Sequence, residues 1–234
     1  MFNSKRALPF AILGIVAGLA GWAYTDYRSW LALGPGGVPY NLQGWAQVTW
    51  FRFQMRNSLD TSFIEAQIGR QGDSRGFDEL TARPGQRPRV DPHPIPHRQL
   101  DQFGDKETRR AQQALFDTVT SGNHLLVYRK SVFERRNDAV CLREPITGNQ
   151  TTAAQGEIAH IHPSDGSMHM TLSPTDAPRV IHAGWGELHG LAGVNGRLPA
   201  TYTMVYSPRN EKEIAVVEQI LHAAVKYAAG VQPK

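Results

Sequence analysis

The chain has 234 residues, of which 41% are hydrophobic and 20% are charged, and its formal net charge is +4. This length suits one ordinary domain with an additional segment, and the apolar fraction excludes both a disordered protein and a bundle of membrane spans. A single cysteine excludes an internal disulfide framework and a Cys-rich zinc site, and the small surplus of positive charge gives no indication of nucleic-acid binding.

The N-terminal segment contains an apolar run. Residues 7–24, ALPFAILGIVAGLAGWAY, carry no charged side chain, and a membrane-spanning helix needs about 17–25 such residues. Basic residues precede the run and aromatic residues close it, which is typical of the two interfaces of a bilayer. We therefore expect residues 1–24 to form an N-terminal transmembrane helix, which makes the protein a single-pass membrane protein. A cleaved signal peptide and a buried helix are the alternatives.

The next segment, residues 25–68, interleaves tryptophan and phenylalanine with arginine. We expect a juxtamembrane helical region here, with a helix over residues 41–57. Two interpretations of that helix stay open. It either lies in the membrane interface or packs its aromatic stripe on the core of the domain.

Residues 69–98 form a predicted connector that is rich in glycine, proline and arginine. The run PHPIPH (92–97) cannot be helical, because proline disfavours the helical conformation of the residue before it. The connector is either a linker or an extended arm that lies against the folded domain. In the second case it can bring His97 or Arg98 to a functional site.

Residues 99–230 are predicted to form one α+β domain. An amphipathic helix is expected over residues 105–120, and a last helix over 208–229, with Pro208 at its first position and Asn210 as its cap. Between them lie six short apolar segments that are expected to be strands: 124–130, 138–143, 157–162, 168–173, 179–184 and 201–207. Strands bracketed by helices predict a single antiparallel sheet flanked by helices, rather than alternating βαβ units.

Three of the nine histidines fall within ten residues: His160, His162 and His169. In a strand, residues two apart share a face, so His160 and His162 point the same way. If the turn sequence PSDG (163–166) forms a four-residue hairpin loop, His162 pairs with Ser167 and His160 pairs with His169. All three imidazoles then converge on one face of the sheet.

A five-residue loop is the alternative register, and it would turn His169 to the opposite face. The four-residue loop also places Met168, Met170 and Leu172 together on the other face, where they can join the core. This pattern of apolar residues favours the register in which the histidines converge.

Three converged imidazoles indicate chemistry of two kinds. A histidine serves as a general base near neutral pH, and neutral imidazoles also bind divalent metals such as zinc, iron or copper. Ordinary hydrogen-bonded histidines are the structural alternative. Glu157 lies three residues before His160 and could orient it, although strand alternation points this carboxylate away from the histidines.

The segment HAGWGELHGLAG (182–193) is a second dense patch. Small residues beside Trp185 would let a flat ligand approach the indole, and His189 follows four residues later. A core tryptophan in a tight turn is the alternative. Arg209, at the start of the last helix, could hold an acidic oxygen or be a solvated surface arginine.

Five segments together resemble the fungal luciferase family and its wider luciferase-like domain. No single one is decisive, but their order and spacing are specific, and the resemblance covers nearly the whole chain. The segments are DYRSWLALGPGGVPYNLQGW (26–45), EIAHIH (157–162), SMHM (167–170), GWGELHGLAG (184–193) and YSPRNEKE (206–213).

The resemblance implies an oxygen-dependent enzyme, an oxidoreductase tethered to the endoplasmic reticulum or another endomembrane and in contact with membrane lipid. Luciferases of this family oxidise a hydroxylated pyranone, 3-hydroxyhispidin. Oxygen adds to the ring, a cyclic peroxide forms, carbon dioxide leaves and an excited product emits light. The resemblance implies no nicotinamide or flavin and no cofactor beyond molecular oxygen, although a divalent metal stays open. The partner is a small aromatic substrate, and the oligomeric state and light emission stay open.

The histidines at positions 160, 162 and 169 match the paired strands of the family and are the candidate catalytic residues, or the ligands if a metal is bound. The candidate substrate-binding residues are Trp185, His189, Arg209 and Arg98. The chain departs from the luminous members in the hairpin loop, in the Thr-rich stretch before it and in a shorter C-terminal tail. A metal-dependent enzyme of other chemistry and a non-catalytic binder of aromatic metabolites are the rival functions.

Overall fold

The computed structural model of the chain describes residues 4–71, 76–77, 79–144, 154–194, 196 and 198–230. Its helices are α1 (Ser4–Ala32), α2 (Leu42–Arg52), α3 (Ser62–Gln71), α4 (Lys106–Ser121), α5 (Asp176–His182) and α6 (Glu211–Ala228). Its strands are β1 (Leu126–Lys130), β2 (Asp138–Leu142), β3 (Glu157–Ile161), β4 (Met168–Thr171), β5 (Gly186–Leu188) and β6 (Tyr202–Val205).

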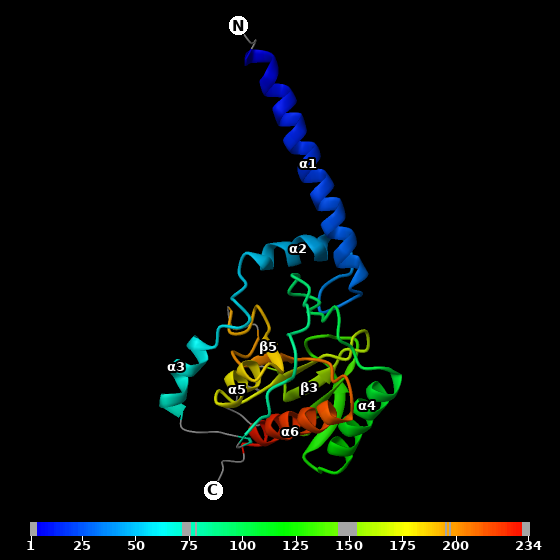
Figure 1. Cartoon of the computed structure of the whole chain (residues 1–234), viewed down its shortest axis with the longest axis vertical. Helices are drawn as coiled ribbons and strands as arrows, with labels where there is room; N and C mark the ends of the chain where they lie inside the picture. The colour runs from blue at the N-terminus through cyan, green and yellow to red at the C-terminus, as the bar shows by residue number, and fades with distance from the viewer. Residues whose placement is uncertain are drawn as a thin grey trace.

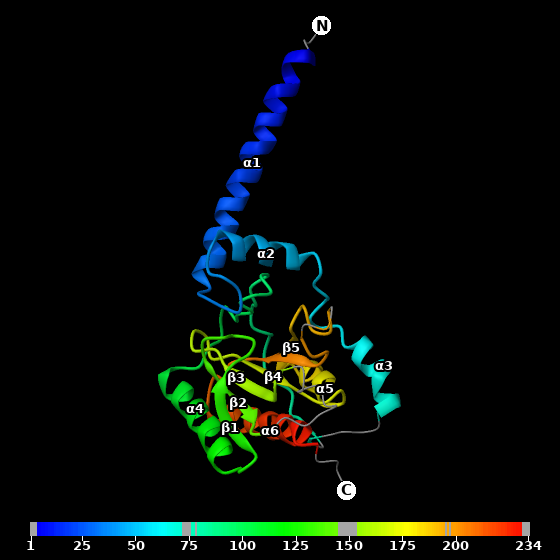
Figure 2. The same ribbon diagram turned by 180° about the vertical axis from the view of Figure 1, so that it is seen from behind.

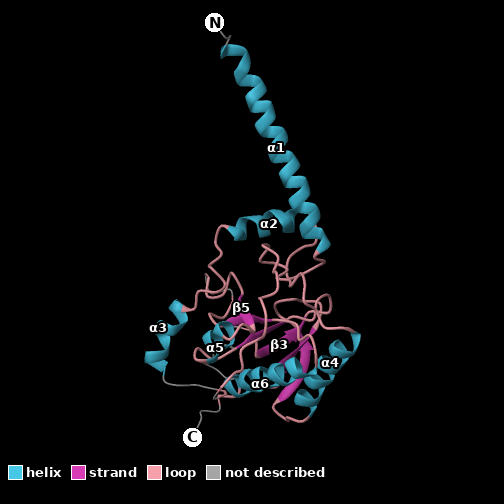
Figure 3. Ribbon diagram, viewed as in Figure 1, coloured by secondary structure: helices cyan, strands magenta, loops and turns pink. Residues whose placement is uncertain are grey.

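The strands form one antiparallel sheet in the order β1-β2-β3-β4-β6-β5. Helices α4 and α6 pack against each other and against the sheet (Figures 2 and 3). The predicted α+β architecture, a single antiparallel sheet flanked by helices, is therefore confirmed in its sheet and helices.

The main core lies between the sheet and these two helices. Met168, Met170 and Leu172 are fully buried there against Phe116 of α4 and Leu221 of α6. Because successive side chains of a strand alternate between its faces, His169 on β4 points away from this core. The residues beyond the opposite face of the sheet form the candidate site.

The N-terminal helix α1 extends away from the body of the molecule (Figure 1). In the part of the chain that the structure describes, no helix combines the length and the apolar character that crossing a membrane requires. The predicted transmembrane helix and the single-pass membrane localisation are therefore wrong. The last two turns of α1 carry the charged residues Asp26 and Arg28.

Polar contacts join α1 to α2 and to the connector. The Asp26 carboxylate accepts hydrogen bonds from Trp45 Nε1 and Arg52 Nη1, each at 2.8 Å, and lies 3.2 Å from His93 Nε2. The helix predicted over 41–57 is observed as the shorter helix α2, which ends at Arg52. Part of its apolar surface packs inward, where Val48 is fully buried beside Trp30, whereas its outer aromatic residues are exposed.

The connector lies against the domain. Arg87 donates a hydrogen bond to the backbone oxygen of Gly186 at 2.7 Å, Val90 pairs with Gln99 in an isolated bridge, and Ile95 accepts a bond from the indole of Trp30 at 2.8 Å. Of the two interpretations of the connector, the structure shows the docked arm for residues 83–98.

Two local predictions are wrong. Residues 179–184 are not a strand but belong largely to α5. Ser173 Oγ accepts the N–H of Asp176 and donates to its carboxylate at the start of this helix, and Pro178 lies in the first turn. The strand β5, which was not predicted, follows the helix. The cap of the last helix is confirmed, since Asn210 Oδ1 accepts from Glu213 N, but Pro208 precedes the cap instead of occupying the first helical position.

Candidate active site

The hairpin of β3 and β4 brings three histidines together. His160 pairs with His169 across the strands, and the backbone N–H of His162 donates to Ser167 O at 2.8 Å, which closes a loop of four residues. The register predicted from the sequence is therefore confirmed. All three imidazoles are at most 3% exposed and lie on the same face of the sheet.

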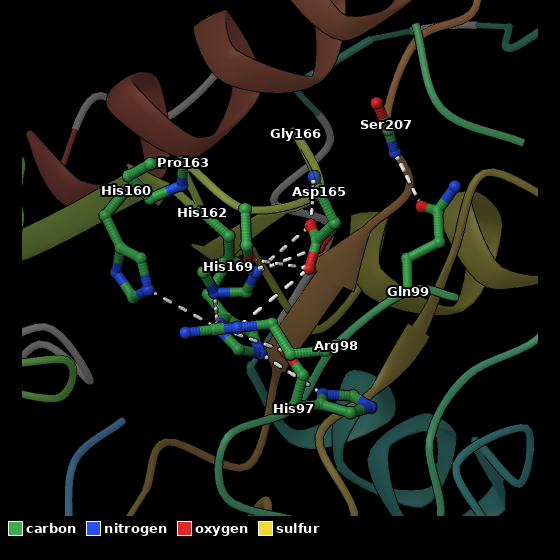
Figure 4. Close-up of polar contacts among 12 residues, drawn as sticks. His97, Arg98, Gln99, His160, His162, Pro163, Asp165, Gly166, His169 and Ser207 are labelled. Atoms are coloured by element: carbon green, nitrogen blue, oxygen red, sulfur yellow. Dashed lines mark hydrogen bonds and ion pairs between the residues drawn. The ribbon is translucent and has the colours of Figure 1, made fainter. Parts of the chain in front are cut away.

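The inner nitrogens of these rings meet (Figure 4). His169 Nδ1 lies 3.0 Å from His162 Nε2 and 3.4 Å from His160 Nε2. Burial lowers the pKa of His162 to about 4, and burial together with the neighbouring histidines lowers the pKa of His169 well below its usual value. At neutral pH, both of these imidazoles are uncharged and keep a lone pair.

Glu157 holds the outer nitrogen of His160, whose Nδ1 lies 2.6 Å from Glu157 Oε1. The carboxylate also accepts hydrogen bonds from Ser131 Oγ and the backbone N–H of Val132. Simple alternation pointed Glu157 away from the histidines, which is wrong because the β2–β3 register shifts between Glu157 and Ala159. Glu157 and Ile158 together oppose Cys141, and such a bulge re-aims a side chain.

The hairpin loop holds His162 in a similar way. Its Nδ1 lies 2.8 Å from Ser167 Oγ, and that hydroxyl donates to Asp165 Oδ1 at 2.5 Å. The pKa of Asp165 is lowered: burial opposes the shift, but the hydrogen bonds from His162 and Ser167 outweigh it. The aspartate is thus ionised at neutral pH.

The docked arm completes the cluster with two residues. His97 Nδ1 lies 3.2 Å from His169 Nε2, and its Nε2 lies 3.3 Å from Glu187 Oε1 of β5. Arg98 makes two hydrogen bonds of 3.0 Å with the carboxylate of Glu134 and lies 3.9 Å from Asp165 Oδ2. The predicted site residue Arg98 is therefore beside the histidines.

Two more rings enclose His169. The centroid of the His189 ring lies 5.5 Å from that of His169 and 5.0 Å from that of His97. His189 Nδ1 accepts a hydrogen bond from the backbone N–H of Leu191. Tyr202 stacks on His169 at 4.7 Å with the planes 17° apart. Its hydroxyl is buried and has no hydrogen-bond partner among the described residues, and burial raises its pKa well above the usual value.

A cavity of about 230 Å³ opens beside these rings. His97, His169, His189 and Tyr202 contribute to one part of its wall, together with Glu134. Much of the remaining wall is apolar and comes from several segments: Val38, Phe51, Ile95, Phe133, Leu191 and Leu198. An apolar cavity with a few polar groups at one side is typical of a small-molecule site.

The structure does not bring Trp185 and Arg209 to this cavity. Trp185 is buried in the main core, and its indole donates to Thr81 O at 2.6 Å. Arg209 Nε donates to Glu213 Oε1 at 2.7 Å, and its guanidinium also bonds to the backbone oxygen of Pro84. The substrate-binding role expected for these two residues stays a prediction that the cluster geometry does not support.

Four residues of the site were not among the sequence-predicted site residues: Glu134, Asp165, Glu187 and Tyr202. Asp165 had a local signal, because it lies inside the predicted hairpin loop. Glu134 follows β1 and reaches the cluster through Arg98. Glu187 and Tyr202 enter because β5 and β6 pair beyond β4, a strand order that their own residues do not specify.

A family model described as the luciferase domain matches residues 155–224, which hold β3 to most of α6 and therefore His160, His162 and His169. A luciferase of Armillaria mellea is 30% identical over 221 residues, covering 86% of this chain and 80% of its own length. A luciferase of Neonothopanus nambi is 30% identical over 218 residues, covering 86% and 79%. No solved structure matches the chain.

Proposed function

This chain belongs to the fungal luciferase family, and we propose on that basis that it is an enzyme that uses molecular oxygen to oxidise a hydroxylated pyranone similar to 3-hydroxyhispidin. The observation that carries the proposal is the cavity whose wall contains His97, His169, His189 and Tyr202, backed by the buried carboxylates. The similar proteins are luciferases, which supports a luciferase-like activity; the substrate and the use of oxygen are our inference.

The cavity wall suits a flat, enolic substrate. The rings of His169 and Tyr202 stack on each other, and the centroid of the Phe133 ring lies 4.7 Å from that of Tyr202. These rings provide aromatic surfaces on which a planar substrate can pack. Apolar residues line much of the rest, so a substrate in the cavity loses most of its contact with water. Electrostatic interactions with the polar side chains are stronger in such an environment.

The first chemical step is the loss of the enol proton. An uncharged imidazole of the cavity wall accepts this proton, and the resulting enolate is electron-rich enough to react with oxygen. His97 and His169 are the imidazoles in this position, and Glu187 stabilises positive charge on His97 because its carboxylate lies 3.3 Å from the ring. Burial opposes the ionisation of Glu187, but its contacts with His97 keep the pKa of Glu187 below the usual value.

Tyr202, in the cavity wall, can stabilise the negative charge that follows. The phenol of Tyr202 remains protonated and has no other acceptor among the described residues, so it can donate to a substrate carbonyl or to a peroxide oxygen. In the overall reaction both atoms of oxygen add to the ring, carbon dioxide leaves and the enol proton returns to the product. The pyranone itself provides the electrons, so the reaction consumes no further reductant.

The test is oxygen uptake by the purified chain with 3-hydroxyhispidin, with carbon dioxide and light recorded in the same vessel. We expect one oxygen consumed and one carbon dioxide released per pyranone. Binding of the pyranone without oxygen uptake would replace the enzyme with a binder of aromatic metabolites. Oxygen uptake without light would keep the oxidation and exclude bioluminescence.

A further inference from the structure

The point at which the three inner nitrogens meet is a further feature of the cluster. One ring nitrogen from each of the three histidines lies within 4.8 Å of the other two. His169 Nδ1 lies 3.0 Å from His162 Nε2 and 3.4 Å from His160 Nε2. Two nitrogens at such distances normally share a hydrogen between them. Whether they do here depends on which nitrogen of each ring carries its proton, and the outer partners decide this.

The outer partners of His160 and His162 are acceptors. Glu157 already accepts from Ser131 and Val132 and can only accept from His160 Nδ1, so the proton of His160 is on Nδ1. The Ser167 hydroxyl donates its one hydrogen to Asp165, so it accepts from His162 Nδ1. In both rings the inner Nε2 therefore keeps a lone pair.

The position of the ring proton on His169 follows from its contact with His97 of the docked arm. Glu187 accepts from His97 Nε2, which leaves a lone pair on His97 Nδ1. That lone pair accepts from His169 Nε2 at 3.2 Å, so the inner Nδ1 of His169 also lacks a proton. Three lone pairs thus point at one another with no hydrogen between them, an arrangement that is unfavourable in a buried site unless a cation occupies the centre.

The distances fit a metal ion. Zinc binds imidazole nitrogen at about 2.0–2.1 Å, so the nitrogens around a tetrahedral ion are about 3.3–3.4 Å apart. The two observed separations, 3.0 and 3.4 Å, are close to this value. Glu134 Oε1 lies 3.7 Å from His162 Nε2 and is a candidate oxygen donor.

The surrounding charge also favours a cation. Four carboxylates lie around the cluster, those of Glu134, Glu157, Asp165 and Glu187. Arg98 is a buried arginine that pairs with Glu134 and lies 3.9 Å from Asp165. Negative charge in a buried region is therefore in excess, and a divalent ion at the centre would offset it. Carboxylates behind metal-binding histidines also raise the basicity of the ligands.

We propose that His160, His162 and His169 bind one divalent transition-metal ion, with Glu134 as an additional oxygen donor. Imidazole ligands suit zinc, iron, nickel and copper, so the inference concerns this class of ion. It goes beyond the proposed oxidation and does not depend on it, because ion binding can be measured without any substrate. Such an ion would act as a Lewis acid beside the cavity, and because it would occupy the His169 Nδ1 lone pair, the proton acceptor of the proposed oxidation would then be His97.

The experiment uses the full chain. Elemental analysis of the purified protein comes first; a chelator then removes bound metal, and the protein is titrated with Zn²⁺ and separately with Co²⁺, whose visible absorption reports nitrogen coordination. We expect one equivalent to bind. His160→Ala and His169→Ala should each weaken ion binding by about 100-fold or more. Glu157→Gln keeps all the imidazoles and the side-chain volume at position 157, and it should weaken ion binding by about 10–100-fold.

His222→Ala is the matched control, because His222 is an exposed histidine on α6 whose ring pairs only loosely with Glu218. It should bind the ion as the wild type does. Failure of the folded wild-type chain to bind either ion, or unchanged binding by the folded Glu157→Gln and His169→Ala variants, would overturn the proposal. So would binding that His222→Ala abolishes.

The two proposals fail separately. One bound ion without oxygen uptake from 3-hydroxyhispidin leaves the metal site standing and removes the proposed oxidation. Oxidation of the pyranone by a folded chain that binds neither Zn²⁺ nor Co²⁺ removes the metal site and leaves the proposed function standing.

Discussion

The histidine cluster and the region around Trp185 are both buried and crowded, yet their polar groups find partners in different ways. Around Trp185, the indole bonds to a backbone oxygen and Arg209 bonds to Glu213. Arg83 lies 3.6 Å from the Glu213 carboxylate, and its Nε and Nη2 make no hydrogen bond among the described residues. In the cluster, three imidazole nitrogens are directed at one another. The Tyr202 hydroxyl lies beside the cavity and has no hydrogen-bond partner among the described residues.

This difference separates two roles. Polar groups that pair within their own region fix the geometry of the chain, whereas groups that keep a free lone pair or hydrogen can bind a ligand. We therefore expect substitutions in the cluster to change activity and substitutions around Trp185 to change stability. Four substitutions test this separation.

The largest effect is expected for His169→Ala. His169 contacts His97, His162, His160 and the cavity, so its loss removes the central member of the cluster. Oxygen uptake with the pyranone should fall by about 10²–10⁴-fold, which is typical of losing a general acid–base group. The control is His222→Ala at the surface. Uptake within threefold of the wild type would remove the cluster from the reaction.

Trp185→Ala should act on stability. A fully buried tryptophan replaced by alanine typically lowers the free energy of unfolding by about 3–5 kcal/mol. Urea unfolding measures this loss, and the initial rate of oxygen uptake per folded molecule should stay near the wild-type value. A stable variant with strongly weakened substrate binding would instead show that Trp185 stacks on the ligand.

Tyr202→Phe removes one buried hydroxyl and keeps the ring that stacks on His169. Turnover should fall by about 100-fold, the usual effect of losing one preorganised donor. Stability should stay the same or rise, because the hydroxyl has no partner among the described residues. Reduced stability with unchanged turnover would make Tyr202 a structural residue.

The smallest effect is expected for Arg209→Ala. Arg209 is partly exposed and pairs with Glu213, which also lies 3.6 Å from Arg83. Loss of such a partly exposed pair typically lowers the free energy of unfolding by about 1 kcal/mol or less. The KM for the pyranone should not change. A tenfold rise in KM would restore Arg209 as a substrate-binding residue.

The local part of the site was predictable and the long-range part was not. A four-residue turn and strand alternation were enough to place His160, His162 and His169 on one face. The bulge that turns Glu157 toward His160 depends on pairing with β2, and Tyr202 arrives through the pairing of β6 with β4. Such contacts between distant segments leave no periodic signal in the sequence.

The fold shows the same limit. Short apolar segments predicted five of the strands, and an amphipathic pattern predicted the first helix of the domain, because each pattern is local. Residues 179–184 are apolar enough for a strand, but the cap formed by Ser173 and Asp176 starts a helix there. At the N-terminus, the absence of charge predicted a membrane span, but the described helix is too weakly apolar to form one.

The most direct test of the central claim is oxygen uptake with 3-hydroxyhispidin by three proteins in parallel: the wild type, His160→Ala and His222→Ala. The claim is that the buried cluster is the reaction centre. We predict uptake by the wild type and by His222→Ala at similar rates, and a loss of about 100-fold or more in His160→Ala. Equal uptake by all three folded proteins, or none by the wild type, would contradict the claim.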